Sequence, residues 1–402
     1  MEKTVFERGY VSSQNAGSIM KIAYILPISW GGIPHYTAEL ANAVSKYADV
    51  TVLKPKDPND ELFSGDVKVI NAFKPMHFSR KQKVSAISPK NIVSLFSFRN
   101  IKLIDDINND IVHFPELYPQ SSIFAFLYRI HKRHPIVSTL HATFDSLLSL
   151  LSTKNIYGIL ASFTEFTKWI VKSDVIIVHT KQDKETLVKK GVNPKNIAVI
   201  PHGSYTFFKN YAKNVVNSDD NNILHFGYIG ENKGIEYLIK AIPIVSQAIP
   251  DIKVIIAGEG NFSKYSKLIE DCSKFEIYNE YIPNEKVPEL FQRAKVVVLP
   301  YTYHRGHSGV LNIAFAFGKP AIVTNVGSLP EMVEYGKSGL IVPPKNPEAL
   351  AEAIIKLLKD DELRKKMSKN ALKRAEELSW DNIAKMHMKV YEEVLNERRS
   401  RS

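Results

Sequence analysis

The sequence has little that would cross-link it or hold it in a membrane. Its 402 residues include a single cysteine, Cys272, which excludes an internal disulfide and a cysteine metal site and fits a reducing compartment. No apolar run reaches the about 18 residues that a membrane-spanning helix needs. Residues 1–19 also lack the apolar core of a signal peptide, so we expect either a disordered extension or a start of translation at Met20.

Acidic residues are in the minority. The chain carries 53 Lys and Arg against 42 Asp and Glu, which gives a net charge of +11. We therefore expect an anionic partner, which could be nucleic acid, a phosphate-bearing substrate or an anionic membrane surface. Nucleic acid is not expected, because the chain has no basic helix, zinc-ligand spacing or aromatic pattern typical of nucleic-acid binding.

Strand-like and helix-like patterns alternate along the chain in two series. Apolar strands separated by helices are typical of parallel sheets covered on both faces, so the expected fold class is α/β. The first series of expected strands is Ile22–Leu26, Val50–Leu53, Val67–Ile70, Ile111–Phe114, Ile136–Leu140, Val175–Val178 and Ile197–Ile200. The second series is Ile223–Phe226, Val254–Ala257, Phe275–Tyr278, Val296–Leu299, Ala321–Val323 and Leu340–Val342.

A polar stretch separates the two series, and three helices follow the second. The expected divisions are a first domain over 20–205, a linker over 206–222, a second domain over 223–378 and a last helix over 379–402. Asn346-Pro347 and Ser379-Trp380 are expected to start the first and last of the three helices. Two α/β halves of this kind bind ligands in the cleft between them, outside the carboxyl ends of the strands.

The stretch 295–313 organises the second half. Val296–Leu299 predict a buried strand that ends at Pro300, and an apolar helix starts at Ser308-Gly309 after a loop. Unpaired N–H groups and the helix dipole converge at such a helix start, so a diphosphate could lie over residues 308–311. Most strand–loop–helix units bind nothing, however, so this motif needs support from others.

Three further motifs could contribute to the same site. Gly31 and Gly32 follow the first strand, where their N–H groups could approach a phosphate or sugar, although a tight turn explains them equally well. His141 ends a buried strand at the expected cleft, although a lone histidine there is often structural. Lys233-Gly234 begin a helix and place an ammonium near its amino terminus; the alternative is a solvated surface lysine.

In order and spacing, the sequence resembles the retaining glycosyltransferases of the GT-B fold, in the family 4 group that uses nucleotide-sugar donors. The resemblance is carried by KIAYILPISWGGIPHYTAELANAV (21–44), IVSTLHATF (136–144), SDVIIVHTKQDKETLVKKGVNPKNIAVIPHGSY (173–205), HFGYIGENKGIEYLIKAI (225–242), VIIAGEG (254–260) and the segment 299–344. It covers about residues 20–395. It implies two Rossmann-like, doubly wound parallel-sheet domains that face a cleft, with the C-terminal helices packing back toward the first domain.

The resemblance also implies roles for residues. His141 matches a histidine that lies beside the donor sugar, and Lys233 matches a lysine that contacts the donor diphosphate. With Arg305, these are the residues expected to act in catalysis. The expected donor-binding residues are Gly31, Gly32, Gly227, Lys233, Gly234, Glu259, Gly306, Ser308, Gly309, Val310 and Leu311. No metal site is expected, because GT-B enzymes generally use helix dipoles and basic side chains instead.

Three positions depart from the family pattern. Gly230 stands where close relatives have an arginine. Arg305 and Ile313 stand where the family has two glutamates, of which the second binds the donor ribose. A branch of the family with Ser-Gly in this loop also lacks the glutamates and matches this chain better. Since a diphosphate in a dry cleft needs roughly two cations, we expect Arg305 to replace the charge missing at Gly230.

The function implied by the resemblance is transfer of a sugar from a UDP-, GDP- or ADP-sugar to a glycan or lipid-linked acceptor, with retention at the anomeric carbon and no cofactor, in the cytoplasm. The acceptor should lie on the first domain. Its segment 77–102 is rich in Lys, Arg, Phe and Ile and has no Asp or Glu. It is either a surface that docks on anionic lipid at the inner face of the membrane, or a solvated, partly helical excursion.

Two other functions remain open. A nucleotide-binding scaffold without turnover is favoured by the missing arginine and glutamates, and opposed by Gly31, Gly32, His141 and Lys233. A GT-B epimerase would interconvert a nucleotide sugar with no acceptor present. A dehydrogenase is not expected, because no G-x-G-x-x-G motif follows the first strand.

Overall fold

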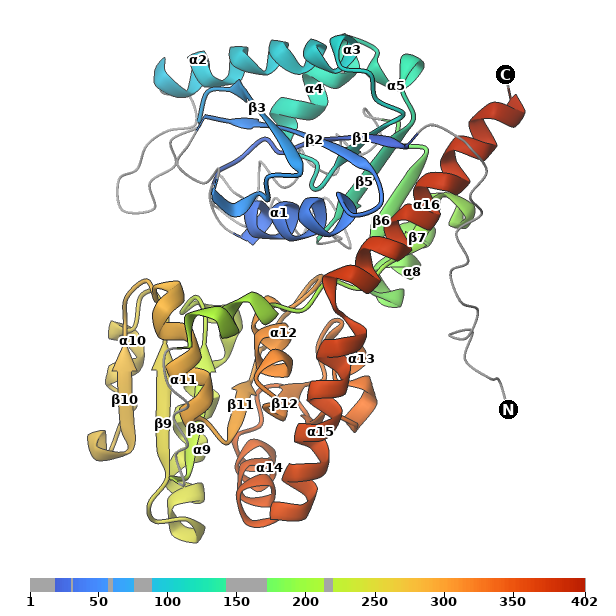
Figure 1. The fold of residues 1–402 in the computed structure, drawn as a ribbon. Helices are drawn as coiled ribbons and strands as arrows, with labels where there is room; N and C mark the ends of the chain where they lie inside the picture. The colour runs from blue at the N-terminus through green and yellow to red at the C-terminus, as the bar shows by residue number, and fades with distance from the viewer. Residues whose placement is uncertain are drawn as a thin grey trace, which may run out of the picture.

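The computed structural model describes residues 19–29, 32–56, 61–75, 89–141, 172–212 and 220–401. They form two α/β halves, one above the other in Figure 1, and the last helix runs from the second half along the first. Every strand expected from the sequence is present, with small shifts at the strand ends, and all strand pairs are parallel. The expected fold class, with two doubly wound halves, is therefore confirmed.

The first half contains a sheet with the strand order β3-β2-β1-β4-β5-β6-β7. Its strands are β1 (Lys21–Ile25), β2 (Asp49–Pro55), β3 (Val67–Phe73), β4 (Ile111–Phe114), β5 (Ile136–Leu140), β6 (Val175–Val178) and β7 (Ile197–Val199). Its helices and 3-10 turns are α1 (Gly32–Val44), α2 (Pro89–Ser97), η2 (Phe98–Lys102), α3 (Leu103–Asp106), α4 (Pro119–Leu127), α5 (Ile130–Arg133), α8 (Lys181–Lys189) and η3 (Pro194–Asn196).

The second half repeats this design with the order β10-β9-β8-β11-β12-β13. Its strands are β8 (Asn222–Phe226), β9 (Lys253–Ala257), β10 (Phe275–Tyr278), β11 (Val296–Leu299), β12 (Ala321–Thr324) and β13 (Gly339–Val342). Its helices and turns are η5 (Glu231–Lys233), α9 (Ile235–Ala248), α10 (Ser263–Ser266), η6 (Cys272–Lys274), η7 (Asn284–Lys286), α11 (Val287–Arg293), α12 (Gly309–Ala316), α13 (Leu329–Met332), η8 (Glu334–Gly336), α14 (Pro347–Lys359) and α15 (Asp361–Glu377).

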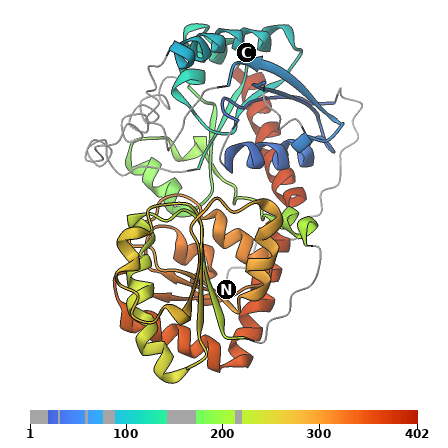
Figure 2. The same ribbon diagram turned by 90° about the vertical axis from the view of Figure 1, so that its left-hand side faces the viewer.

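Each sheet is buried on both faces, which explains why its strands are apolar throughout. On β1, Tyr24 faces the core shared with α1, whereas its neighbour Ile25 faces the core under η2 and α4. On β11, Val298 faces α9 and α14, whereas Leu299 faces α11 and α12. Helices thus cover both sides of each sheet, as Figure 2 shows for the second half, and only the loops at the strand ends remain for binding.

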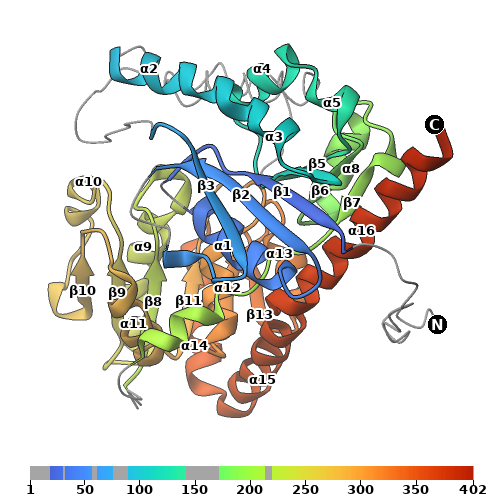
Figure 3. The ribbon, with the colours of Figure 1, turned by 45° about the horizontal axis from the view of Figure 1, so that its top comes forward.

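The last helix, α16 (Trp380–Arg401), belongs to the second half in sequence but packs against the first. Figure 3 shows it passing from α15 along the edge of the upper half. Its buried face includes Ile383 and Tyr391, which join the core around α1. A buried polar chain adds to this contact: the hydroxyl of Tyr391 lies 2.9 Å from the hydroxyl of Tyr24 and 2.6 Å from Nδ1 of His113. The C-terminal helix therefore packs back on the first domain, as expected.

The chain crosses between the halves twice, and the two crossings lie side by side. The backbone N–H of Ser204 donates to the carbonyl of Leu378 at 2.8 Å, and its hydroxyl donates to the carbonyl of Ala375 at 3.0 Å. A Cβ on Gly203 would lie 2.4 Å from the Trp380 ring, so the position requires glycine. The two crossings are thus packed and bonded into one connection.

The segment expected as a linker begins with packed structure. Residues 206–211 form the 3-10 turn η4 (Thr206–Tyr211), whose Phe208 is buried in the core of the second half. At the other end, Asn222 already opens β8. Residues 213–219, and residues 1–18 of the extension expected over 1–19, lie outside the described residues.

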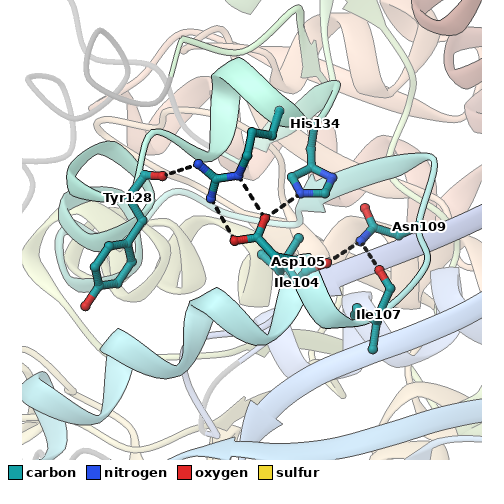
Figure 4. A network of polar contacts seen from close by, with 7 residues as sticks. Ile104, Asp105, Ile107, Asn109, Tyr128 and His134 are labelled. Atoms are coloured by element: carbon teal, nitrogen blue, oxygen red, sulfur yellow. Dashed lines mark hydrogen bonds and ion pairs between the residues drawn. The ribbon is translucent and has the colours of Figure 1, made fainter.

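A polar network closes the far end of the first half (Figure 4). Asp105 on α3 accepts two hydrogen bonds from the Arg133 guanidinium, at 3.0 and 2.8 Å, and its Oδ1 lies 2.8 Å from Nε2 of His134. Arg133 also donates to the carbonyl of Tyr128 at 2.7 Å. The network ties α3 and α5 to the start of β5, the strand that directly precedes His141.

Among the described helices, none is long and apolar enough to cross a membrane.

Candidate active site

A cavity of about 630 Å³ lies between the two halves, at the carboxyl ends of their strands. The first half lines it with the loop after β1 and the start of α1, through Ser29, Gly32, Pro34 and His35. The second half lines it with the loops after β8 and β9 and with the first turns of α12, through Gly227, Tyr228, Gly258, Glu259, Gly309, Val310 and Ile313. Tyr205 and Phe207, at the crossing, close one side. This is where a doubly wound pair is expected to bind its ligand.

The loop that carries Lys233 is pressed against the end of β11. Gly234 has the left-handed φ of 64°, and a Cβ there would lie 1.9 Å from the carbonyl oxygen of Pro300, so no other residue fits without strain. The Lys233 ammonium lies 3.8 Å from the centre of the Tyr301 ring. This contact is within the range of a cation–π interaction and holds the charge over the loop after β11.

Arg305 lies on the loop that receives Lys233. Its guanidinium is 4.8 Å from the centre of the Tyr303 ring. Asn232 joins the two loops, because its carbonyl accepts from the N–H of Thr302 at 3.0 Å and its side chain donates to the carbonyl of Tyr303 at 3.4 Å. Lys233 and Arg305 therefore each contact a tyrosine of the same loop.

The amino terminus of α12 provides amides beside these cations. Ser308 is the N-cap residue, and its side chain makes no capping hydrogen bond. Two amides expected to meet the diphosphate have partners inside the protein: that of Ser308 donates to the sulfur of Met332 at 3.4 Å and that of Leu311 to the carbonyl of Ser308 at 3.2 Å. The preceding amide, that of His307, donates to the carbonyl of His141 at 3.4 Å. The side chain of Leu311 is also fully buried. The first-turn residues Gly309 and Val310 line the cavity, and amides in the first turn of a helix have no partner within the helix.

His141 does not stand alone. It ends β5 beside His179, which ends β6, and Nδ1 of His141 lies 3.1 Å from Nε2 of His179. His202 at the crossing and His307 on the second half complete the cluster, with their rings stacked at 4.6 Å. Burial, together with the neighbouring His179 and His202, holds the pKa of His141 well below its usual value. Burial also lowers the pKa of His179 to about 4.

Glu116, which follows β4, supports the backbone beside this histidine cluster. One carboxylate oxygen accepts from the N–H of Leu117 at 2.9 Å, and the other accepts from the N–H of His141 at 3.2 Å. The carboxylate therefore fixes the backbone at the end of β5. Both of its oxygens thus accept hydrogen bonds from the backbone.

The sequence-based site residues fall into three groups. Gly32, Gly227, Glu259, Gly309 and Val310 line the cavity. Lys233, Gly234, Arg305, Gly306 and Ser308 belong to the paired loops and the helix start, and His141 to the histidine cluster. Gly31 lies outside the described residues. Ile313 lines the cavity as an apolar side chain, where the family pattern has a ribose-binding glutamate.

Sequence reasoning missed His35, Glu116, His179 and His307. His179 directly follows a buried strand, as His141 does, so its position in the sequence also predicts a place at the cleft. Nothing local marks the other three, because their contacts are made by distant segments. Among the described residues, no group of three or more His, Cys, Asp or Glu side chains could hold a metal ion.

Both halves of the chain match family models. Residues 30–204 match the model described as Glycosyltransferase Family 4, and residues 207–374 match Glycosyl transferases group 1. The chain is 32% identical over 224 residues to an uncharacterized glycosyltransferase of Methanocaldococcus jannaschii, a match that covers 54% of this chain and only 55% of that protein. It is 23% identical to phosphatidyl-myo-inositol mannosyltransferase of Mycolicibacterium smegmatis, over 93% of this chain and 94% of that one.

Solved structures share the fold. Sucrose-phosphate synthase of Thermosynechococcus elongatus superposes with a TM-score of 0.70 at 22% identity, covering 94% of this chain and 99% of that one. Anabaena HepE, in a complex with UDP and glucose, superposes with a TM-score of 0.64 at 17% identity, covering 93% of this chain and 100% of that one. With both halves matched to glycosyltransferase domains and the whole chain to structures of this fold, the chain belongs to the GT-B glycosyltransferases of the family 4 type.

Proposed function

We propose that the protein transfers a sugar from a nucleotide-diphosphate donor to a glycan or lipid-linked acceptor, with retention at the anomeric carbon and without a metal. The observation that carries the proposal is the pairing of Lys233 and Arg305 on one tyrosine-bearing loop, beside the first turn of α12. Cations and helix amides at one point are suited to a diphosphate. Anabaena HepE, which has the same fold, was solved with UDP and glucose, and this supports a nucleotide-sugar donor.

The residues would act by stabilising the leaving group. As the glycosidic bond breaks, negative charge gathers on the departing diphosphate, and fixed cations and amides stabilise that charge without reorganising. Lys233, Arg305 and the amides of Gly309 and Val310 would serve in this way. The departing phosphate oxygen would assist attack by the acceptor on the same face of the sugar, so no protein nucleophile is needed. The engaged carboxylate of Glu116 agrees with such a mechanism.

We further propose that the first half docks on anionic lipid. Of the segment 77–102, residues 77–88 lie outside the described residues. In the rest, Val93 and Phe96 on α2 are 51% and 61% exposed, and Arg99 and Lys102 follow on η2. On the adjoining helix α4, Phe126 and Leu127 are 45% and 61% exposed. Exposed apolar side chains beside cations suit the interface of an anionic bilayer.

Co-sedimentation with liposomes tests the docking. Binding should require anionic lipid and should weaken in Phe96→Asp, because a carboxylate at this position opposes both apolar burial and the lipid charge. Val188→Asp, at a 39% exposed position on α8, is the matched control and should bind as the wild type does. Binding that is indifferent to anionic lipid would remove this part of the proposal.

A donor panel tests the transferase proposal itself. UDP-, GDP- and ADP-sugars would be screened by thermal shift, since a ligand at a hundred times its dissociation constant stabilises by about 2.7 kcal/mol. The preferred donor should then give a glycosylated product only when acceptor is present, and chelation of metal ions should not abolish the reaction. Interconversion of the donor without acceptor would instead identify an epimerase. Binding of the donor without transfer to any acceptor would instead support the alternative function, a nucleotide-binding scaffold.

A further inference from the structure

His141 directly follows β5, and His179 directly follows β6. The two histidines form a pair in which each of the four ring nitrogens faces a polar partner. Leu140 pairs with Val178 in the sheet, so the next residues, His141 and His179, lie side by side. Nδ1 of His141 and Nε2 of His179 face each other at 3.1 Å. The outer nitrogens face backbone carbonyls: Nε2 of His141 lies 3.0 Å from the oxygen of Pro115, and Nδ1 of His179 lies 2.9 Å from that of Ile200.

When both rings are neutral, the pair has one N–H too few to make all of these hydrogen bonds. A carbonyl oxygen can only accept, so each outer nitrogen must carry a hydrogen to make its bond. A neutral imidazole has only one N–H. The two inner nitrogens then both present lone pairs at 3.1 Å, and no hydrogen bond joins them. One added proton completes the chain as carbonyl, imidazole, imidazolium and carbonyl.

Neighbouring histidines show no such shortage. Nδ1 of His202 lies 2.8 Å from the carbonyl of Gly203, and its Nε2 lies 3.3 Å from the hydroxyl of Tyr205. His113 lies between the hydroxyls of Tyr391 and Thr139. A hydroxyl can donate or accept, so a neutral ring satisfies each of these partners. The missing proton is thus a property of the His141–His179 pair.

The surroundings keep the pair neutral in the free protein. The groups that face it are mostly uncharged at neutral pH or positive when protonated: Tyr36 from α1, His113 from β4, His202 from the crossing, His307 from the loop after β11 and His387 from α16. The contacting carboxylate is Glu116, which holds the backbone N–H of His141. Burial lowers the pKa of both paired rings, to about 4 for His179, so near pH 7 the extra proton is absent.

A bound donor would change this balance. The carbonyl of His141 accepts from the N–H of His307, the residue just before the N-cap of α12. The proposed diphosphate site at Gly309 and Val310 begins two residues further on. A diphosphate brings negative charge into a buried region where charges are weakly screened, and nearby negative charge favours the protonated form of an imidazole.

We propose that binding of the donor diphosphate is coupled to uptake of one proton, which His141 Nδ1 and His179 Nε2 then share. The inference rests on the proposed function. Solvent supplies the proton, one N–H bond forms, and the resulting N–H···N hydrogen bond locks the ring of His141. His179 is thus a positioning residue for His141, and the pair becomes a third cation near the diphosphate in the donor complex.

Calorimetry of donor binding tests the coupling. The protein would be titrated near pH 7 with UDP-glucose, GDP-mannose or ADP-glucose, whose diphosphates have no group that titrates in this range. Buffers with different ionisation enthalpies would be compared, because the observed enthalpy varies with them in proportion to the protons exchanged. We expect net uptake approaching one proton, and an affinity that increases by up to about tenfold for each pH unit of acidification.

Three variants test whether the His141–His179 pair binds the proton. In His179→Gln, the side-chain amide can donate to His141 without an added proton, so donor binding should persist while uptake is lost. His179→Phe preserves the aromatic packing and should also lose the uptake. His134→Gln, at the opposite end of β5, is the control and should retain it.

The outcomes separate the two proposals. Donor binding in the wild type with a buffer-independent enthalpy would overturn the coupling and leave the proposed function intact. Undiminished uptake in either His179 variant would equally overturn it. A failure of all three donors to bind would instead refute the nucleotide-sugar function, and the coupling with it. If both variants fail to fold, the wild-type measurement still decides whether binding takes up a proton.

Discussion

At the residue scale, the side chains of Lys233 and Arg305 each contact a tyrosine of the same loop. Lys233 lies over Tyr301 and Arg305 over Tyr303, at 3.8 and 4.8 Å from the ring centres. An aromatic face attracts a cation without neutralising it, unlike a carboxylate. The proposed function uses these two charges to bind the donor diphosphate.

We predict that Lys233→Ala and Arg305→Ala weaken donor binding by similar amounts. Each removes one charge-assisted hydrogen bond to the diphosphate, worth about 1.5–3 kcal/mol, or roughly a tenfold to hundredfold loss of affinity. Calorimetry with the preferred nucleotide sugar measures the effect. Lys240→Ala is the control, because Lys240 also lies over a tyrosine, Tyr237, but projects from the exposed side of α9. An Arg305→Ala protein with unaltered affinity would show that its charge has not replaced the one missing at Gly230.

A second residue-scale prediction concerns Gly234. In Gly234→Ala the new methyl would meet the Pro300 carbonyl at 1.9 Å, at a φ of 64° that alanine disfavours. The loop must shift, so we expect a loss of about 1–3 kcal/mol in the free energy of unfolding and weaker donor binding. Denaturant unfolding and calorimetry measure the two effects. Gly65→Ala should be nearly neutral, because nothing lies within 4 Å of its added methyl. Equal behaviour of the two variants would contradict the strain argument.

At the scale of elements, α16 connects the end of the chain to the beginning. Its Tyr391 hydroxyl meets Tyr24 on β1 and His113 on β4, and Nε2 of His113 lies 2.8 Å from the hydroxyl of Thr139 on β5. The polar chain therefore links the last helix to three neighbouring strands of the first sheet. Buried polar groups of this kind are costly when one partner is removed, because the other loses both water and its hydrogen bond.

We predict that Tyr391→Phe destabilises the protein by about 1–3 kcal/mol, since it leaves the Tyr24 hydroxyl and His113 Nδ1 without this partner inside the core. The measurement is the denaturant concentration at the midpoint of unfolding, compared between proteins whose unfolding free energy depends on denaturant with the same slope. Tyr335→Phe is the matched control, because Tyr335 is 74% exposed and should lose almost nothing. A Tyr391→Phe midpoint equal to that of the wild type would mean that the chain of hydroxyls adds no stability.

At the scale of the whole molecule, the halves meet through polar contacts and two packed crossings. Glu331 on α13 accepts from the N–H groups of Lys181 and Gln182, at 3.0 and 3.4 Å, and so binds the amino terminus of α8 across the interface. The histidine cluster lies between the same halves, with His141 and His179 on one side and His307 on the other. Protonation of this cluster would place several positive charges at the interface.

We predict that the protein loses stability steeply in mild acid. Burial lowers the pKa of His179, His225 and His387 to about 4 and that of His202 to about 3, whereas an unfolded histidine has a pKa of about 6.5. Between these values the unfolded chain binds more protons, so the free energy of unfolding falls as the pH falls. Each histidine contributes up to about 1.4 kcal/mol per pH unit.

The midpoint of thermal unfolding, measured from about pH 7 down to about pH 5, checks this prediction. His387→Phe should flatten the dependence by the share of one histidine, because it removes one buried ring, whose Nδ1 lies 2.8 Å from the carbonyl of Ile383 and whose Nε2 lies 3.5 Å from the hydroxyl of Tyr36. A midpoint that stays level or rises on acidification would contradict the assignment of neutral, buried rings.

Much of the site could be predicted because its parts are local. The strand β11, the loop after it and the start of α12 follow one another in sequence, and so do β8, Lys233 and Gly234. Parallel strands bring such loops to one edge of a sheet. The amides of Ser308 and Leu311 were expected to meet a ligand, but they bond within the protein: the distant Met332 approaches that of Ser308, and that of Leu311 bonds to the carbonyl of Ser308.

The sequence by itself determined the two series of strands, the three final helices and the loops of the second half, because apolar periodicity and glycine placement act over short stretches of chain. Only the tertiary structure decided that His141 is paired with His179, since that contact depends on the register of β5 against β6. It also decided that Tyr391 completes the core of the first half. Neighbours that are hundreds of residues apart are chosen by packing, and no local pattern encodes that choice.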